Sequence, residues 1–217
     1  NIFIWDEKTP EEQRAALADA GQPFNHDPRG EAERKRYEDT QRKNAQRLRD
    51  RKQWEQYRGA LGKENMPSFS GFRRMKAAGS ENYRFMRLDY LRQNRLKLNP
   101  ELALPNASKA TAADEKFTKY LFNPDNKDGW AKGVAFTSRL GYNTCNWEDL
   151  KANILGSAIK YPSSIHGQNM YGTLYEQPMV LYGPSGKPAN VKIGWCCDDE
   201  DTWMTTAMLE EWKDGKD

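Results

Sequence analysis

The sequence has few cysteines, which form the disulfides of small secreted proteins, and few histidines, which often bind metal ions. It contains three cysteines and two histidines among 217 residues. The adjacent pair Cys196 and Cys197 cannot readily form a disulfide within a strand, and an odd number of cysteines argues against a disulfide scaffold. The cysteines, His26 and His166 do not show the spacing of metal ligands. We therefore expect a reducing compartment, no metal and no cofactor.

Long apolar runs are also missing. Hydrophobic residues make up 37% of the chain and charged residues 30%, with a mean hydropathy of −1.01. No run approaches the ~20 apolar residues that a membrane helix needs. The amino terminus lacks the basic flank and apolar core of a signal peptide. We expect no membrane segment, and a chain too polar for one compact core should be partly extended or packed on a partner.

The charges that are present are segregated along the chain. Residues 1–28 and residues 100–217 each carry a net charge of −4, whereas residues 29–99 hold 20 basic and nine acidic residues, a net charge of +11. Such a segment attracts phosphate backbones or an acidic protein surface, and the attraction falls with salt. A solvated helix with merely solubilising charges is the alternative. The candidate nucleic-acid contacts are Arg47, Arg51, Arg73, Arg74 and Lys76.

Residues 1–99 are predicted to be an extended helical domain. Thr9-Pro10-Glu11-Glu12 has the cap, the proline and the acidic first turn of a helix start. Residues 31–58 contain no Gly or Pro and favour a long helix with a sparse apolar stripe, which should lie along a partner or another helix. Shorter helices are expected at residues 68–78 and 83–98.

Residues 100–217 are predicted to begin with helices. Phe117, Tyr120 and Leu121 have the i, i+3, i+4 spacing of one helix face, and Asn123-Pro124 ends this helix. The next helix carries Lys132 in its first turns. Its apolar face should contain Trp130, Val134 and Leu140.

The rest of residues 100–217 is predicted to form one more helix, followed by strands. Asn146 caps the helix, which should continue to about Lys160. Strands are expected at Tyr171–Tyr182, Val191–Cys197 and Trp203–Leu209, separated by turn-forming or acidic residues. Helices followed by an antiparallel sheet predict an α+β domain that can bury its own core.

Both halves resemble phage proteins. The motif FRRMKAAGSENY at residues 72–83, after a long charged helix, is similar to the C-terminal helical part of minor capsid proteins of tailed phages. The last half resembles a C-terminal domain found on phage head proteins and at the tips of bacterial polymorphic toxins. The positions that carry this second resemblance are Leu104-Pro105-Asn106, Lys116, Tyr120-Leu121-Phe122-Asn123-Pro124, Gly129, Lys132, Phe136, Leu140-Gly141-Tyr142, Tyr171-Gly172-Thr173, Trp195 and Thr205-Thr206.

The resemblance implies a function. It implies a toxin associated with a phage minor capsid protein, located in the virion or the bacterial cytoplasm, with capsid or portal proteins and an immunity protein as partners. The order of elements is similar to the small ribonuclease folds that include barnase and several colicins, which implies RNA as the substrate. Asn126 and Lys127 stand where the family usually has histidine and proline, a departure that puts activity in question.

Metal-independent RNA cleavage needs a base for the 2′-hydroxyl, an acid for the leaving 5′-oxygen and a cation for the phosphorane. Lys132 is the expected cation, and His166, in the SIHGQ segment ahead of the first expected strand, is the expected acid or base. We expect Lys132 to point toward the sheet face, with His166 at its rim. The residues expected to orient the phosphate are Thr173, Tyr175, Thr205 and Thr206.

Other interpretations of these residues stay open. Strand threonines often serve β-propensity alone, and Lys132 could be a surface lysine. The whole chain could be a structural or interaction module that binds capsid, portal or DNA without catalysis, as Asn126 would allow. Among the tryptophans, Trp130, Trp147 and Trp195 are expected to pack, whereas Trp203 and Trp212 are the better candidates for exposed contacts.

Overall fold

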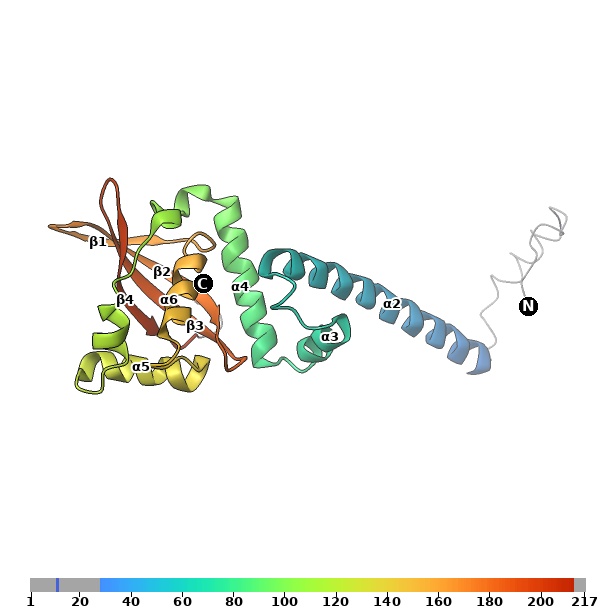
Figure 1. Ribbon diagram of the computed structural model, residues 1–217. Coiled ribbons are helices and arrows are strands. Elements are labelled where there is room, and N and C mark those ends of the chain that lie inside the picture. Colours follow the sequence, from blue (N-terminus) through green and yellow to red (C-terminus); the bar gives the residue numbers. More distant parts are fainter. Residues whose placement is uncertain (1–10, 12–27, 213–217) are drawn as a thin grey trace. The chain divides into compact units, whose positions relative to one another are not determined.

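A computed structural model describes residue 11 and residues 28–212 (Figure 1). The predicted helix start at Thr9-Pro10 and the predicted loop around His26 lie outside the described residues. The chain divides into two compact units, Asn1–Arg51 and Lys52–Asp217. We describe each unit by itself.

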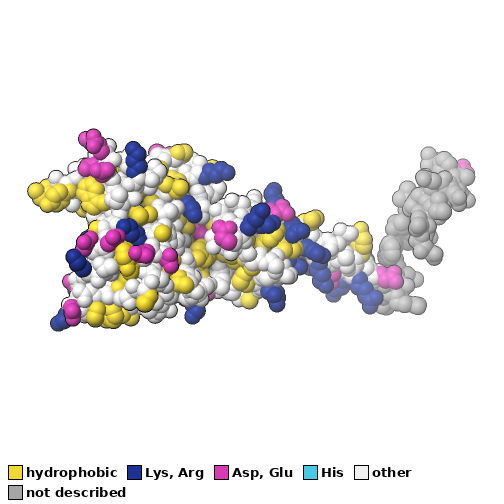
Figure 2. Space-filling model, in the orientation of Figure 1, with side chains coloured by type: hydrophobic (Ala, Val, Ile, Leu, Met, Phe, Trp, Pro, Cys, Tyr) yellow, Lys and Arg dark blue, Asp and Glu magenta, His cyan; other side chains and the backbone are white. Residues whose placement is uncertain are grey.

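Apart from residue 11, the described part of the first unit is the amino-terminal portion of α2, a helix that spans Pro28–Leu61 and continues into the second unit. This confirms the long helix expected at residues 31–58, which the absence of glycine and proline permits. Tyr37 and Leu48 are 66% and 72% exposed, so these two apolar side chains of the helix are not covered by described residues. Lys and Arg side chains follow the helix (Figure 2).

The second unit is an α+β domain in which helices precede a four-stranded antiparallel sheet of order β1-β2-β3-β4. This confirms the predicted fold class. The elements after α2 are α3 (Phe69–Ala77), α4 (Glu81–Leu98), the 3₁₀ turns η2 (Pro100–Leu102) and η3 (Ala107–Lys109), the π-helical turn η4 (Lys116–Leu121), α5 (Lys127–Leu140), α6 (Trp147–Ser157), β1 (Ser164–Asn169), β2 (Gly172–Tyr182), β3 (Pro188–Cys197) and β4 (Thr202–Leu209).

Side-chain caps set the starts of α3 and α4. The hydroxyl of Ser68 accepts a hydrogen bond from the backbone N–H of Gly71, and that of Ser80 accepts one from Tyr83. Each cap satisfies a backbone donor that has no partner within the helix. The two helices and the end of α2 then bury a small cluster of their own. Its buried members are Tyr57, Leu61, Phe72 and Met86.

One face of the sheet forms the main core. Because successive strand residues point to opposite faces, the odd-numbered residues of β2 and β3 pack together against η4, α5 and α6. Trp195 is fully buried there, and its indole N–H donates to Gln177 Oε1 at 3.0 Å. The other fully buried side chains of this core include Phe117, Leu121, Phe136, Leu140, Leu150, Ile154, Met179, Leu181 and Ile193.

The opposite face is covered by α4 at one end only. Val180 packs with Phe85 and Leu88 of α4. The Arg92 guanidinium donates to Asn190 Oδ1 at 2.7 Å, which ties the same helix to β3. The helix α4 thus belongs to the same compact unit as the sheet, Lys52–Asp217, whereas the sequence analysis placed a domain boundary between residues 99 and 100.

A buried carboxyl group also joins α4 to the sheet. Asp89 Oδ1 lies 2.6 Å from Tyr161 Oη, and Asp89 Oδ2 accepts from Tyr182 Oη at 3.1 Å. Tyr161 Oη also lies 2.9 Å from the carbonyl of Val180. The Tyr161 hydroxyl is placed to donate its one proton to Asp89 Oδ1 and to the Val180 carbonyl, and Asp89 Oδ1 also accepts from Gln93 Nε2 at 2.9 Å. Burial raises the pKa of Asp89, and the hydrogen bonds from Tyr161, Gln93 and Tyr182 oppose this shift.

The predicted apolar face of α5 is correct for Leu140, which is fully buried, and wrong for Trp130 and Val134. Trp130 and Val134 are 40% and 45% exposed. The helix instead buries Gly129 and Gly133 beside Phe136 and Leu140. A Cβ at Gly133 would lie 1.8 Å from the Leu121 carbonyl oxygen, so the glycines allow α5 to approach η4 closely.

The sheet also contains an edge strand that the sequence pattern did not indicate. β1 pairs antiparallel with β2, and a register shift lies between Ile165 and Gly167. His166 is therefore a strand residue and not part of a segment ahead of the sheet. The strand was missed because its side chains are mostly polar and exposed. None of the described helices combines the length and apolar character needed to cross a bilayer.

Candidate functional site on the open face of the sheet

The six predicted catalytic residues do not come together in one place. The structure separates them between the helical layer, the core face of the sheet and the opposite face. One phosphate group cannot contact residues on both faces, because the sheet lies between them. The predicted arrangement of Lys132 with Thr173, Tyr175 and Thr205 around a single phosphate is therefore wrong.

Lys132 belongs to the helical layer. Its amine donates to Tyr120 Oη at 2.9 Å and lies 5.2 Å from the centroid of the same ring. Tyr120 packs against the main core from η4. The lysine thus has a local partner on the side of the sheet that carries α5, and it does not reach Thr205 on the opposite face.

Thr173 and Tyr175 lie on the core face of β2. Tyr175 pairs with Trp195 and packs against the main core, and Thr173 pairs with Cys197. Both line a cavity of about 540 Å³ at the β1–β2 turn. Gln168 Nε2 approaches the Thr173 hydroxyl at 3.4 Å across the hairpin.

Thr205 and Thr206 lie together on the other face because of a β-bulge. The register of β3 and β4 shifts between Gly194 and Trp195, so that one extra residue of β4 opposes β3. A Cβ at Gly194 would lie 2.8 Å from Thr205 Oγ1 and 2.8 Å from Thr206 Cγ2. Both side chains consequently stand over the same glycine.

His166 reaches this same face from the edge strand. Its Nδ1 atom lies 3.6 Å from Glu176 Oε1 on β2, and Glu176 pairs with Gly194. The histidine side chain is 65% exposed, and the glutamate side chain is 33% exposed. A substrate can therefore reach both groups from solvent.

Lys192 on β3 lies next to Glu176 on the same face. Lys192 Nζ lies 3.5 Å from Glu176 Oε1 and 2.6 Å from Glu210 Oε1. The hydrogen bond to Glu210 is the main reason that the pKa of Lys192 is raised, and the charges of Glu210 and Glu176 add to it. The amine therefore stays positively charged well above neutral pH. We call the site formed by His166, Glu176, Lys192, Thr205 and Thr206 the open-face cluster.

Sequence reasoning found three members of the open-face cluster and missed Glu176 and Lys192. A usable signal was present, because each is a charged residue inside an otherwise apolar or uncharged strand. On a strand with one buried face, such a residue marks the other face. The pairing that brings His166 to Glu176 depends on β1, which the pattern did not reveal.

The predicted nucleic-acid contacts are divided between the two units. Arg47 and Arg51 are exposed on the part of α2 in the first unit, and Arg73 and Arg74 are exposed on α3 in the second. Lys76 donates to Gln53 Oε1 at 2.5 Å, so its amine already has a protein partner. Their role in binding nucleic acid stays a prediction.

The tryptophans follow the predicted roles only in part. Trp195 is fully buried, and Trp147 stacks on Phe117 at 5.7 Å. Trp203 is half-buried, and Trp212 packs near Phe85 with ring centroids 5.8 Å apart. Across residue 11 and residues 28–212, no three His, Cys, Asp or Glu side chains are arranged to hold a metal ion.

Comparison with known proteins finds a family match in the second half of the chain. Residues 103–208 match the model of a family described as a domain of unknown function, DUF6883. The matched segment is just under half of the chain and contains all five residues of the open-face cluster. No curated protein and no solved structure matches the chain.

Proposed function

We propose that the α+β unit is a ribonuclease domain that cleaves single RNA strands at the open-face cluster. The observation that carries this proposal is one carboxylate oxygen, Glu176 Oε1, with His166 Nδ1 at 3.6 Å and Lys192 Nζ at 3.5 Å. A base, an acid and a cation thus meet on a solvent-accessible sheet face. These are the groups that RNA transphosphorylation requires.

The reaction assigns a role to each group. The Glu176 carboxylate takes the proton of the ribose 2′-hydroxyl, and the 2′-oxygen attacks the adjacent phosphorus. The bond from phosphorus to the 5′-oxygen breaks, and protonated His166 donates its proton to that leaving oxygen. The products are a 2′,3′-cyclic phosphate and a free 5′-hydroxyl. Lys192 and the hydroxyls of Thr205 and Thr206 neutralise charge that develops on the phosphorane oxygens.

Glu210 is expected to compete with the substrate. Its carboxylate is 2.6 Å from Lys192 Nζ, and a phosphate group needs the same amine. Lys192 and its two glutamate neighbours together carry a net negative charge. RNA must therefore displace Glu210 as it binds, which makes binding sensitive to salt.

The sequence outside the open-face cluster supports a proposal for where this activity is used. We propose a phage minor capsid-associated toxin, located in the virion or the bacterial cytoplasm, with capsid or portal proteins and an immunity protein as partners. The support is the resemblance of residues 72–83 and 104–142 together with the basic helix α2. The basic segment is expected to bind DNA or an acidic capsid surface without sequence preference.

The test is cleavage of a fluorogenic single-stranded RNA by the purified chain in the presence of a chelator. Glu176→Gln and His166→Gln should each lower the rate by about 10²- to 10⁴-fold, because each removes a proton-transfer group. The control Lys132→Ala should retain the rate, since Lys132 lies in the helical layer. A wild-type chain without cleavage, or variants that cleave as well as wild type, would refute the proposal.

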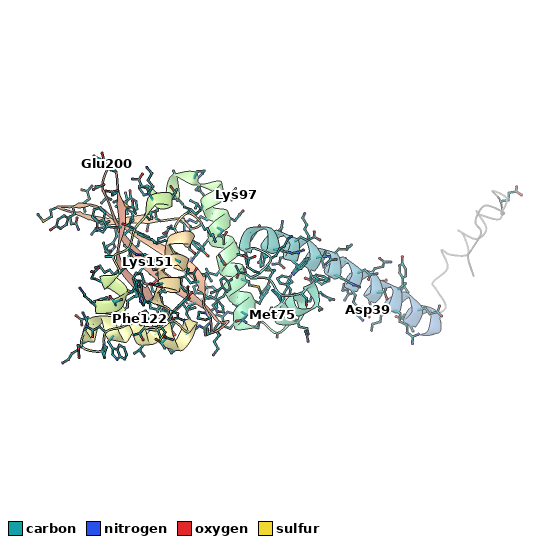
Figure 3. The ribbon with its side chains drawn as sticks, in the orientation of Figure 1. Asp39, Met75, Lys97, Phe122, Lys151 and Glu200 are labelled. Carbon is teal, nitrogen blue, oxygen red and sulfur yellow. The ribbon has the colours of Figure 1, made fainter. Side chains whose placement is uncertain are left out.

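A second candidate function is the binding of a protein partner without catalysis. One observation favours it. Ile165, Met170 and Tyr171 are 67%, 87% and 66% exposed at the β1–β2 hairpin, beside the acidic β3–β4 loop that carries Glu200 (Figures 2 and 3). An exposed apolar tip next to carboxylates suits a protein surface with a basic rim. Absence of cleavage together with salt-dependent binding of a capsid or immunity protein would favour this alternative.

A further inference from the structure

We propose that Trp203 forms a base-stacking subsite beside the open-face cluster, so that the nucleobase next to the reacting phosphate stacks on its indole ring. This inference rests on the proposed ribonuclease function and names a part of the site that recognises the substrate. A single-stranded RNA segment is the substrate class, because only an unpaired base can lie flat on an aromatic side chain.

The register of β4 places Trp203 on the correct face. Its neighbours Thr202 and Met204 are buried, and Thr202 Oγ1 donates to the carbonyl of Pro105 at 2.7 Å. Alternation along the strand turns Trp203 to the opposite face. Trp203 pairs there with Cys196, and Cys196 pairs with Leu174.

The subsite is adjacent to the proposed reaction centre. Cys196, which pairs with Trp203, lies two residues after Gly194 on β3. The side chains of Thr205 and Thr206 lie next to Gly194. Two strand residues span roughly 6.6 Å. A base on Trp203 and its own phosphate at the threonine hydroxyls can therefore occupy neighbouring positions on one face.

The charges around the subsite orient a nucleotide. The exposed run Asp198–Asp201 precedes Trp203 and repels phosphate. Backbone N–H groups of Asp201 and Glu200 donate to Asp198, which lowers the pKa of that carboxyl and keeps it ionised. Lys192 lies on the other side of Gly194. An uncharged base is thus favoured at Trp203, and the phosphate is favoured toward Lys192.

The backbone at Trp203 is held on both sides. The N–H of Thr111 donates to the carbonyl of Thr202 at 2.9 Å, and the N–H of Met204 donates to the carbonyl of Thr111 at 2.8 Å. Trp203 itself is half-buried, so part of this residue is accessible to a ligand. Because the backbone is already fixed here, Trp203 loses only side-chain freedom when a base stacks on it.

The experiment measures binding of a labelled 2′-O-methyl RNA tetranucleotide, which lacks the attacking hydroxyl, by fluorescence anisotropy. Trp203→Leu should raise the Kd roughly 5- to 100-fold, and Trp203→Phe should raise it less because an aromatic face remains. Trp130→Leu is the matched control, since Trp130 is 40% exposed on α5 at the other layer of the domain. The control should bind as wild type does.

An oligonucleotide with one abasic position, moved along the strand, separates stacking from altered folding. At one abasic position, the affinity of wild type should fall to the affinity that Trp203→Leu has for the intact oligonucleotide. The affinity of Trp203→Leu should not fall further when the same base is removed. If Trp203→Leu lowers the melting temperature, the abasic series on wild type decides. Wild-type affinity that is indifferent to every abasic position overturns the subsite.

The outcomes also separate this inference from the proposed function. A wild-type chain that cleaves RNA while Trp203→Leu binds as tightly as wild type refutes the subsite and leaves the ribonuclease proposal intact. A wild-type chain that neither cleaves nor binds RNA refutes both. Cleavage together with weakened binding by Trp203→Leu, and not by Trp130→Leu, supports both.

Discussion

The two faces of the same four-stranded sheet differ in almost every property. On the core face, Val191, Ile193 and Trp195 are fully buried against helices. On the opposite face, the residues between them include Lys192 and Gly194, and the neighbouring strands add Glu176 and two threonines. One strand thus contributes alternately to packing and to a polar surface.

The difference comes from how much of each face is covered. Three helical elements cover the core face, whereas α4 covers only the end of the opposite face near Val180 and Asn190. Charged side chains remain tolerable where the cover stops, because water still solvates them. The core face therefore provides most of the stability. The candidate catalytic residues lie on the part of the opposite face that α4 does not cover.

The largest expected effect is on the core face. Trp195→Ala should lower the free energy of unfolding by about 3–5 kcal/mol, because it leaves a cavity and an unpaired Gln177 oxygen. Urea denaturation of the whole chain measures this. Trp130→Ala, which alters a 40% exposed ring, is the control and should change stability far less. Equal losses in the two variants would contradict the assignment of the core face.

The next effect concerns the open face and should leave folding intact. Lys192→Met should lower the rate of RNA cleavage about 100-fold, because it removes the charge that stabilises the phosphorane. Its melting temperature should stay close to wild type, since partly exposed ion pairs contribute little to stability. Lys187→Met, at an exposed position in the β2–β3 loop, provides the control. If Lys192→Met lowers the melting temperature but retains the rate of RNA cleavage, Lys192 serves stability and not catalysis, and the assignment of roles to the two faces is wrong.

The smallest effect is a pH dependence at the covered end of the open face. Asp89 has a raised pKa in the folded chain, so its stabilising contribution is present below its ordinary value of 3.8 and is lost as pH rises through the folded-state pKa. Asp89→Asn does not titrate. We expect wild type to exceed Asp89→Asn by about 0.5–1.5 kcal/mol at low pH, and this advantage should shrink or reverse toward neutral pH.

Urea denaturation of both proteins between acidic and neutral pH checks this expectation. The opposite trend, in which wild type gains on the variant as pH rises, would show that ionised Asp89 is the stabilising form. Asp114→Asn is a suitable control, because Asp114 is exposed and pairs with Lys151 on the far side of the core. Its difference from wild type should not follow the same course.

Local signals in the sequence predicted most of the helices and three of the four strands. Ser68 and Ser80 cap helices, Pro124 follows the end of η4, and turn-forming or acidic residues bound the strands β2, β3 and β4. These features depend on neighbours along the chain, so the sequence contains the information for them. Part of the face of α5 was predicted wrongly because close approach to the Leu121 carbonyl favoured Gly133 over the bulkier Trp130 and Val134.

By itself, the sequence determined the fold class, the charge segregation and the positions of the polar residues along each strand. Tertiary structure decided which of these residues share a surface. The bulge at Gly194 turned Thr205 and Thr206 to one side, and pairing of β1 with β2 brought His166 to Glu176. The physical reason is that strand register and sheet faces depend on contacts between distant segments, and a shift of one residue moves a side chain to the other face.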